Sequence, residues 1–200
     1  MSANGAESDD RPSGHSEAAN GVGGLIRAVV AGITVVAMLV VTVVHWSDPV
    51  IALALTGLVA VAGWLSLTDI EQRRLPNRIV GPLAAAVTVG VILAGVLGSD
   101  LDRSGRAMLF GLAAAGFFLV GNLVGGMGMG DVKYAYPIGA TLGWYGLEPL
   151  LNALLITVVI GGLAAVAVLA SGKGRRYRLP YGPFMSLGLV AGLLTAAPGL

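Results

Sequence analysis

Residues 150–170 read LLNALLITVVIGGLAAVAVLA, from Leu150 to Ala170, and contain no charged side chain. A helix of about 20 apolar residues, rising about 1.5 Å per residue, crosses the hydrocarbon core of a bilayer. Inside lipid each backbone N–H and C=O needs a partner within the protein, and a helix supplies one locally. This stretch therefore predicts a transmembrane helix.

Similar runs extend outward from this stretch in both directions. Together they predict seven spans, at about residues 25–44, 50–67, 79–97, 107–124, 134–147, 150–170 and 184–197. The whole chain is 56% hydrophobic and 12% charged, whereas soluble domains have about 25% charged residues. We predict an all-α fold, a polytopic transmembrane helical bundle over residues 25–200, with residues 1–24 forming a disordered cytoplasmic tail.

The composition also excludes several kinds of chemistry. There is no Cys, so disulfides, thiol nucleophiles and Cys-ligated zinc are ruled out. Of the two histidines, His15 lies in the predicted tail and His45 lies at the opposite membrane side from the motifs below, which disfavours Ser-His-Asp catalysis. A net charge of +1 argues against nucleic-acid binding. We expect no metal and no cofactor.

Lys and Arg are distributed unequally if the predicted helices alternate across the bilayer. Ten fall on the side that holds Arg73, against only Arg103 and Arg106 on the other side. The positive-inside rule places the richer side in the cytoplasm. Asp69 and Asp131 both fall on that side, so we expect them at the same membrane face.

The first motif is TDIEQRRLPN, from Thr68 to Asn77, directly after an apolar run. Asp69 is placed where the hydrocarbon ends, and Pro76 prevents the helix from continuing through the loop. The alternative is a structural role, in which Asp69 merely ends a span and pairs with Arg73 or Arg74.

The second motif is GGMGMGDVK, from Gly125 to Lys133. Its glycines permit unusual backbone conformations and close approach of another chain, so a peptide could lie beside Asp131. It lacks the spacing of a phosphate-binding loop. The alternative is a hinge between helices with a solvated pair of Asp131 and Lys133.

Two carboxylates at one membrane face suggest an aspartic peptidase. Such an enzyme needs two carboxyl groups that share one proton, because both cannot ionise at about 3 Å separation. The mechanism requires no nucleophile from the protein, which fits a chain without Cys. We predict that Asp69 and Asp131 are the catalytic pair.

The combination of DIEQRRLPN with GMGMGDVK, followed by PIGATLGW from Pro137 and LPYGPF from Leu179, resembles the type IV prepilin peptidases. The resemblance covers roughly residues 55–192. It implies an inner-membrane aspartic endopeptidase that removes the basic leader of prepilin or pseudopilin precursors after a Gly, at the cytoplasmic face. It also implies that site-shaping or substrate-binding roles belong to Gly128, Gly130, Lys133, Pro76 and Asn77. Lys133 either orients Asp131 or meets an acidic group of the substrate.

The chain departs from the larger bacterial members of that family. These have a cytoplasmic insertion near the amino terminus, often with paired Cys, that is associated with methylation of the new amino terminus. Here only His45 to Pro49 separates the first two predicted helices, and Cys is absent. We therefore expect a compact peptidase that does not methylate its product.

Two other functions compete with this interpretation. A noncatalytic scaffold or a small transporter would use Asp69 and Asp131 to handle ions or protons. An intramembrane protease acting on unrelated helices would cut inside the apolar part of its substrate. The sequence does not predict an oligomeric state.

Overall fold

A computed structural model describes residues 14–45, 49–124, 127–172 and 179–196, and within these ranges every regular element is an α-helix. The helices are α1 (Gly14–Val44), α2 (Pro49–Gln72), α3 (Asn77–Leu97), α4 (Leu101–Leu123), α5 (Met129–Tyr145), α6 (Leu147–Ala170) and α7 (Gly182–Thr195). The predicted all-α bundle is confirmed.

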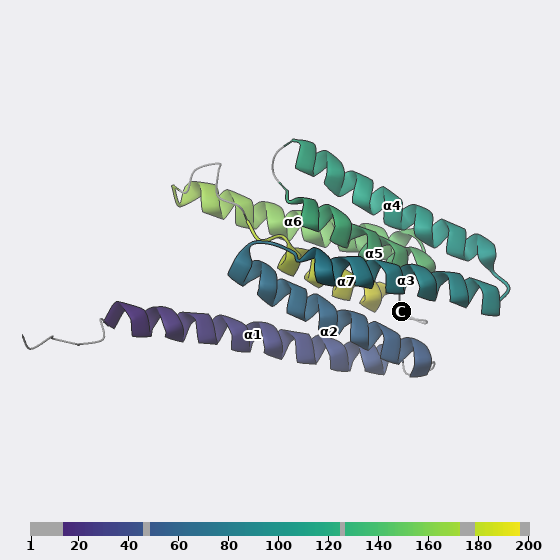
Figure 1. The fold of residues 1–200 in the computed structure, drawn as a ribbon, viewed down its shortest axis with the longest axis horizontal. Helices are drawn as coiled ribbons and strands as arrows, with labels where there is room; N and C mark the ends of the chain where they lie inside the picture. Colours follow the sequence, from purple (N-terminus) through teal and green to yellow (C-terminus); the bar gives the residue numbers. More distant parts are fainter. Residues whose placement is uncertain (1–13, 46–48, 125–126, 173–178, 197–200) are drawn as a thin grey trace, which may run out of the picture.

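The helices run up and down, so the connections alternate between two ends of the bundle (Figure 1). One end carries the start of α1 and the α2–α3, α4–α5 and α6–α7 connections. Both sequence motifs lie at this end, which is called the motif end below. Segments that are distant in sequence therefore meet there.

Five helices are long and apolar enough to cross a membrane: α1, α2, α3, α4 and α6. The candidate span is Gly23–Val44 in α1 and Ala52–Gln72 in α2. Large apolar side chains such as Leu155, Leu163 and Val166 on α6 are exposed. Apolar surface that faces outward in this way suits lipid, because lipid tails are as apolar as these side chains. The chain is a multi-pass membrane protein.

Helix α5 is shorter and lies in the interior, packed by α3, α4, α6 and α7. Glycines allow its closest contact, with α4. A Cβ on Gly139 would lie 2.9 Å from the carbonyl oxygen of Phe110 and 2.7 Å from the Cβ of Ala114. Small residues at a membrane helix interface let the backbones approach in this way. Burial on all sides explains why α5 needs no continuous lipid-facing surface.

Two predicted boundaries differ from the structure. Helix α1 begins at Gly14, whereas the first span was predicted from about residue 25; residues 1–13 lie outside the described ranges. Helix α5 begins at Met129 and not at Tyr134, because the side chain of Asp131 caps its start. The Gly-rich motif thus forms a helix start.

Candidate active site

Asp69 lies in the last turn of α2, with 4% of its surface exposed. Its Oδ2 atom accepts a hydrogen bond of 2.7 Å from the backbone N–H of Gly182, the first residue of α7. The first N–H groups of a helix have no partner within it and carry partial positive charge, so they bind a carboxylate well. The start of α7 therefore holds Asp69 in place.

Gly182 leaves little space for a side chain beside this contact. A Cβ added there would lie 3.0 Å from Oδ2 and 3.1 Å from Cβ of Asp69. Pro183 follows within the first turn of α7, where a missing N–H costs nothing. The pair Gly182-Pro183 thus starts the helix and leaves room for the carboxylate.

Asp131 lies in the first turn of α5, with 6% of its surface exposed. Its Oδ2 atom accepts a 2.9 Å hydrogen bond from the N–H of Gly128, the residue that caps the helix. Burial raises the pKa of Asp131 to about 7; the Gly128 bond opposes this rise, and the nearby charge of Asp69 adds to it. Asp131 is therefore a carboxyl group that holds a proton near neutral pH.

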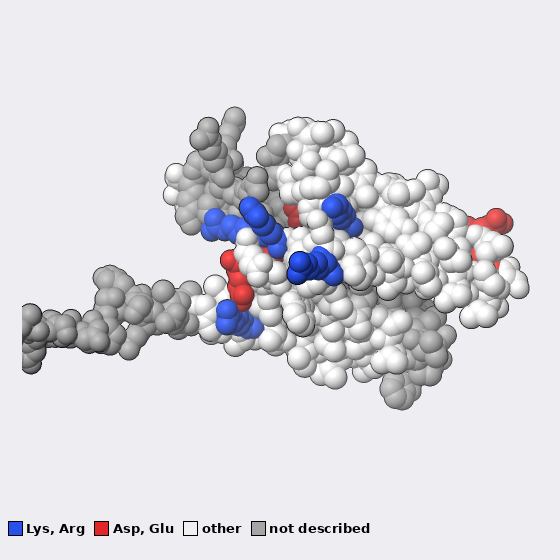
Figure 2. All heavy atoms as spheres, viewed as in Figure 1, with Lys and Arg blue, Asp and Glu red and all other residues white. Residues whose placement is uncertain are grey.

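Both aspartates line one cavity of about 580 Å³ at the motif end. Its other walls come from the α2–α3 connection, the end of α4 and the start of α5, and its lining also includes Arg73, Arg74, Leu75, Asn77, Asn122, Met127, Met129, Lys133 and Leu179. Basic side chains gather towards this end of the molecule, and acidic ones appear both beside them and at the far end (Figure 2). The structure thus brings the two predicted aspartates together in a polar cavity.

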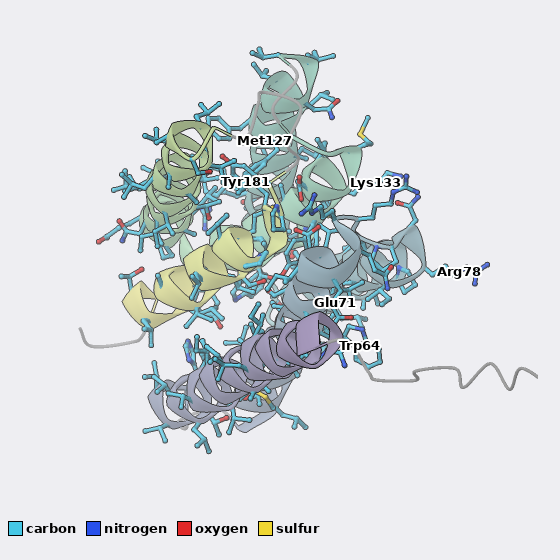
Figure 3. The ribbon with its side chains drawn as sticks, turned by 90° about the vertical axis from the view of Figure 1, so that its left-hand side faces the viewer. Trp64, Glu71, Arg78, Met127, Lys133 and Tyr181 are labelled. Atoms are coloured by element: carbon cyan, nitrogen blue, oxygen red, sulfur yellow. The ribbon has the colours of Figure 1, made fainter. Side chains whose placement is uncertain are left out.

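Of the other predicted site residues, Pro76 caps the start of α3, where its carbonyl oxygen accepts a 3.1 Å bond from Val80 N–H. Asn77 accepts a 3.0 Å bond from Nζ of Lys133, which joins the two motifs directly. In the view onto this end, Lys133 lies among the helices, whereas Arg78 points outward from the bundle (Figure 3). The solvated pair of Asp131 and Lys133 left open by the sequence is not what the structure shows, because Asp131 is buried.

The motif glycines have different surroundings. A Cβ on Gly130 would lie 2.9 Å from Cβ and 3.4 Å from the backbone N and O of Leu75. The close approach predicted at the glycine motif is thus made, at Gly130, by the α2–α3 connection of the same chain. Gly128 donates to Asp131, as described above.

Sequence analysis missed two contributors next to the site. It assigned no role to Gly182, although LPYGPF, with Gly-Pro opening an apolar run, is a helix-start pattern. It also missed Tyr181, which precedes Gly182 at the start of α7 and is labelled in the view onto this end (Figure 3). Burial and the charge of Asp131 raise the pKa of the Tyr181 hydroxyl. Its neutral O–H is thus retained near Asp131.

Within the described ranges, no group of three or more His, Cys, Asp or Glu is arranged to hold a metal ion. Asn122, at the end of α4, donates a 2.7 Å bond to the carbonyl oxygen of Met127 and so fixes the start of the glycine motif. The polar groups of the site therefore organise one another across α2, α4, α5 and α7.

Comparison with known proteins identifies the family of this chain. The sequence model of the type IV leader peptidase family matches residues 56–166, more than half of the chain and a stretch that includes both aspartates. This chain belongs to that family. The resemblance stated from the motifs is confirmed.

Two bacterial relatives are prepilin leader peptidase/N-methyltransferases. That of Burkholderia pseudomallei strain K96243 is 35% identical over 158 residues, 74% of this chain and 48% of the relative. That of Xanthomonas campestris pv. campestris is 30% identical over 140 residues, 65% of this chain and 44% of the relative. The chain thus spans about half the length of these relatives. No solved structure matches it significantly.

Proposed function

We propose that this chain is a membrane-embedded aspartic endopeptidase that removes the basic leader of type IV prepilin or pseudopilin precursors. The observation that carries the proposal is the placement of Asp69 and Asp131 in one cavity, each bound by a backbone N–H. The names of the relatives support the substrate class, and the family membership supports peptidase activity.

The two carboxyl groups each accept one backbone N–H from the start of a helix, Asp69 from Gly182 of α7 and Asp131 from Gly128 at the cap of α5. Asp131 is distinguished by the large rise of its pKa. Asp131 keeps its proton up to about pH 7. We therefore assign the general base to Asp69 and the general acid to Asp131.

The reaction then follows the usual course for a carboxyl pair. Asp69 takes a proton from a water molecule, whose oxygen bonds to the scissile carbonyl carbon while Asp131 gives its proton to the carbonyl oxygen. The resulting diol loses the amine as the C–N bond breaks. Asp69 returns its proton to the leaving nitrogen, and a diol hydroxyl returns one to Asp131, so the pair is regenerated.

The proposed location is the cytoplasmic face of the inner membrane, with cleavage after a Gly just before the apolar stem. The charge distribution supports this face, because the basic side chains gather at the end that holds the cavity (Figure 2). A leader that lies at the surface while the stem remains in the bilayer would bring the scissile bond to the height of the two carboxyl groups.

The first test uses purified protein in detergent, a candidate prepilin and mass spectrometry of the products. We expect a shortened precursor with one new amino terminus. Asp69→Asn and Asp131→Asn should each reduce kcat by at least about 10⁴-fold, because residues that act as a unit fail together. Asp102→Asn, at the far end of the bundle, is the matched control and should cleave normally. Cleavage that survives either active-site change would rule out the shared-proton mechanism.

A second expectation concerns methylation. Only His45 to Pro49 links the first two apolar runs, and the sequence has no Cys. With S-adenosylmethionine added to the same reaction, the mass of the new amino terminus should stay that of the free amine. A product heavier by one methyl group would contradict this expectation and leave the peptidase assignment intact.

A further inference from the structure

Three hydroxyl groups meet in the interior of the bundle, and we call Ser66, Tyr134 and Ser186 the hydroxyl cluster. Ser66 Oγ donates to Ser186 Oγ at 2.9 Å, and the Tyr134 hydroxyl lies 3.1 Å from the same Ser186 oxygen. All three residues are buried, Tyr134 completely. The cluster joins α2, α5 and α7 through one oxygen atom.

The cluster lies one helical turn below the proposed catalytic pair. Ser66 precedes Asp69 by one turn on α2, Tyr134 follows Asp131 by one turn on α5, and Ser186 follows Gly182 by one turn on α7. Residues three or four apart share one face of a helix. The hydroxyls therefore face the same axis of the bundle as the carboxyl groups above them.

Helix α7 is the link between the helices that carry the two aspartates. It packs against both α2 and α5, whereas α2 and α5 have few or no direct backbone neighbours among the described residues. The separation of Asp69 from Asp131 thus depends on how each helix is fixed to α7, together with the contacts of the α2–α3 connection with Gly130 and Lys133. The hydroxyl cluster makes both of those attachments at Ser186.

Each of the two serine hydroxyls has a hydrogen-bond acceptor within its own helix, so burial alone does not require a bond between the helices. Ser66 has the carbonyl oxygen of Ala62 at 2.8 Å within its own helix, and Ser186 has that of Gly182 at 3.0 Å. Ser186 can donate its one proton to that carbonyl and accept from both Ser66 and Tyr134 with its two lone pairs. Ser66 has one proton, which it can donate either to Ala62 or to Ser186, so its bond to Ser186 takes the place of the bond within its own helix.

We propose that Ser66, Tyr134 and Ser186 are positioning residues that fix the separation of Asp69 and Asp131 by clamping α2 and α5 to α7. This inference rests on the proposed aspartic mechanism, in which the two carboxyl groups must stay close enough to share one proton. Loosening the clamp separates the carboxyl groups and admits water. The protonated form of Asp131 is then less favoured, so the alkaline limb of the pH–rate profile moves to lower pH.

The test compares variants that remove one hydroxyl each. Tyr134→Phe removes the bond between Tyr134 and Ser186, and Ser66→Ala removes the bond between Ser66 and Ser186. Ser186 Oγ also lies 3.1 Å from the carbonyl oxygen of Ala62 on α2, and Ser66→Ala leaves this contact in place. Tyr136→Phe is the matched control, because Tyr136 lies on the same helix and its hydroxyl makes an equivalent 2.9 Å bond, to Thr88 of α3. Ser66→Thr is the rescue variant, since it keeps the hydroxyl and a cavity of about 90 Å³ beside Ser66 has room for a methyl group.

The measurements are kcat, KM and the pH–rate profile for cleavage of a prepilin, with thermal stability in detergent as the check on folding. For Tyr134→Phe and Ser66→Ala we expect kcat to fall about tenfold, the effect of one buried hydrogen bond, with KM nearly unchanged. The alkaline limb should move down by about half a pH unit. Tyr136→Phe should lose a similar amount of thermal stability without moving the alkaline limb. Ser66→Thr should return the alkaline limb to its wild-type position.

An alkaline limb that stays in place in both cluster variants, or that moves equally in Tyr136→Phe, would overturn the inference. If Tyr134→Phe does not fold, Ser66→Ala and Ser66→Thr still decide it. Wild-type protein that cleaves no prepilin would overturn the proposed function alone. In that case an infrared titration of the carboxyl band that disappears in Asp131→Asn tests the clamp directly, since Ser66→Ala should lower its midpoint and Tyr136→Phe should not.

Discussion

At the residue scale, burial of the Asp131 carboxyl group raises its pKa and lowers the stability of the fold at high pH. Its pKa is about 7 in the folded protein, against 3.8 for the unperturbed group. A carboxyl whose folded pKa is raised is fully compatible with folding below pH 3.8. Its ionisation increasingly opposes folding as the pH rises from there to about 7. The same burial that supplies an acid near neutral pH therefore weakens the fold in alkaline solution.

This predicts a pH-dependent gain in stability from Asp131→Asn. The amide is neutral at every pH and still offers an oxygen to Gly128 N–H, so the variant avoids the cost of burying a charge. At pH 8 its thermal midpoint should exceed that of the wild type by several degrees, as expected for a change of a few kcal/mol. The gain should shrink as the pH is lowered towards 4. Thermal melts in detergent across this range measure it, and a gain that does not vary with pH would contradict the assigned cause.

Ion pairing at the surface has a smaller role. Arg27 Nε and Glu71 Oε1 are 2.7 Å apart and link α1 to α2. Both side chains are well exposed, so water and salt screen the attraction, and such pairs contribute about 0–1 kcal/mol. The relative placement of α1 and α2 depends mainly on helix packing.

At the element scale, the position of α5 depends on its contact with α4. Gly139 faces the backbone of α4, where an added Cβ would meet a carbonyl oxygen and the Cα of Gly111 at 3.0 Å. Backbone atoms cannot turn aside as a flexible side chain does. Asp131 lies at the start of the same helix, so a displaced α5 also displaces the proposed acid.

We therefore expect Gly139→Ala to destabilise the protein by about 1–3 kcal/mol, the usual range for overpacking, and to lower cleavage. The matched control is Gly116→Ala on α4, because a Cβ there meets nothing within 4 Å. The control should be neutral or more stable by up to about 1 kcal/mol, the helix propensity of Ala over Gly. Thermal stability in detergent distinguishes the two, and equal effects would show that the α4–α5 contact is not tightly packed.

At the scale of the whole molecule, the absence of Cys makes the orientation in the membrane directly measurable. Gln72 lies at the end of the bundle that holds the cavity, and Asp102 lies at the opposite end; both are exposed. In spheroplasts, a membrane-impermeant maleimide should label Asp102→Cys at once and Gln72→Cys only after the membrane is permeabilised. The reversed pattern would place the cavity outside the cytoplasm and contradict the proposed orientation.

For the residues that the structure describes, the sequence alone was sufficient for the number and class of helices. A run such as Leu150–Ala170 has one stable conformation in lipid, because only a helix satisfies its backbone locally. Helix starts were less predictable. The glycine motif is typical of a loop, yet a capping bond from Gly128 to Asp131 begins α5 at Met129. Such a bond depends on the exact geometry of a few residues, which composition does not record.

The sequence also determined which acidic residues to consider, because Asp69 and Asp131 stand in motifs at the ends of apolar runs on the same predicted side. Only the tertiary structure decided what surrounds them. The donor to Asp69 is Gly182, 113 residues away in the chain, and the hydroxyl cluster joins residues from three helices. Local sequence fixes helices because their hydrogen bonds are local. The polarity and spacing of the site come from contacts between distant segments, and those exist only once the bundle has packed.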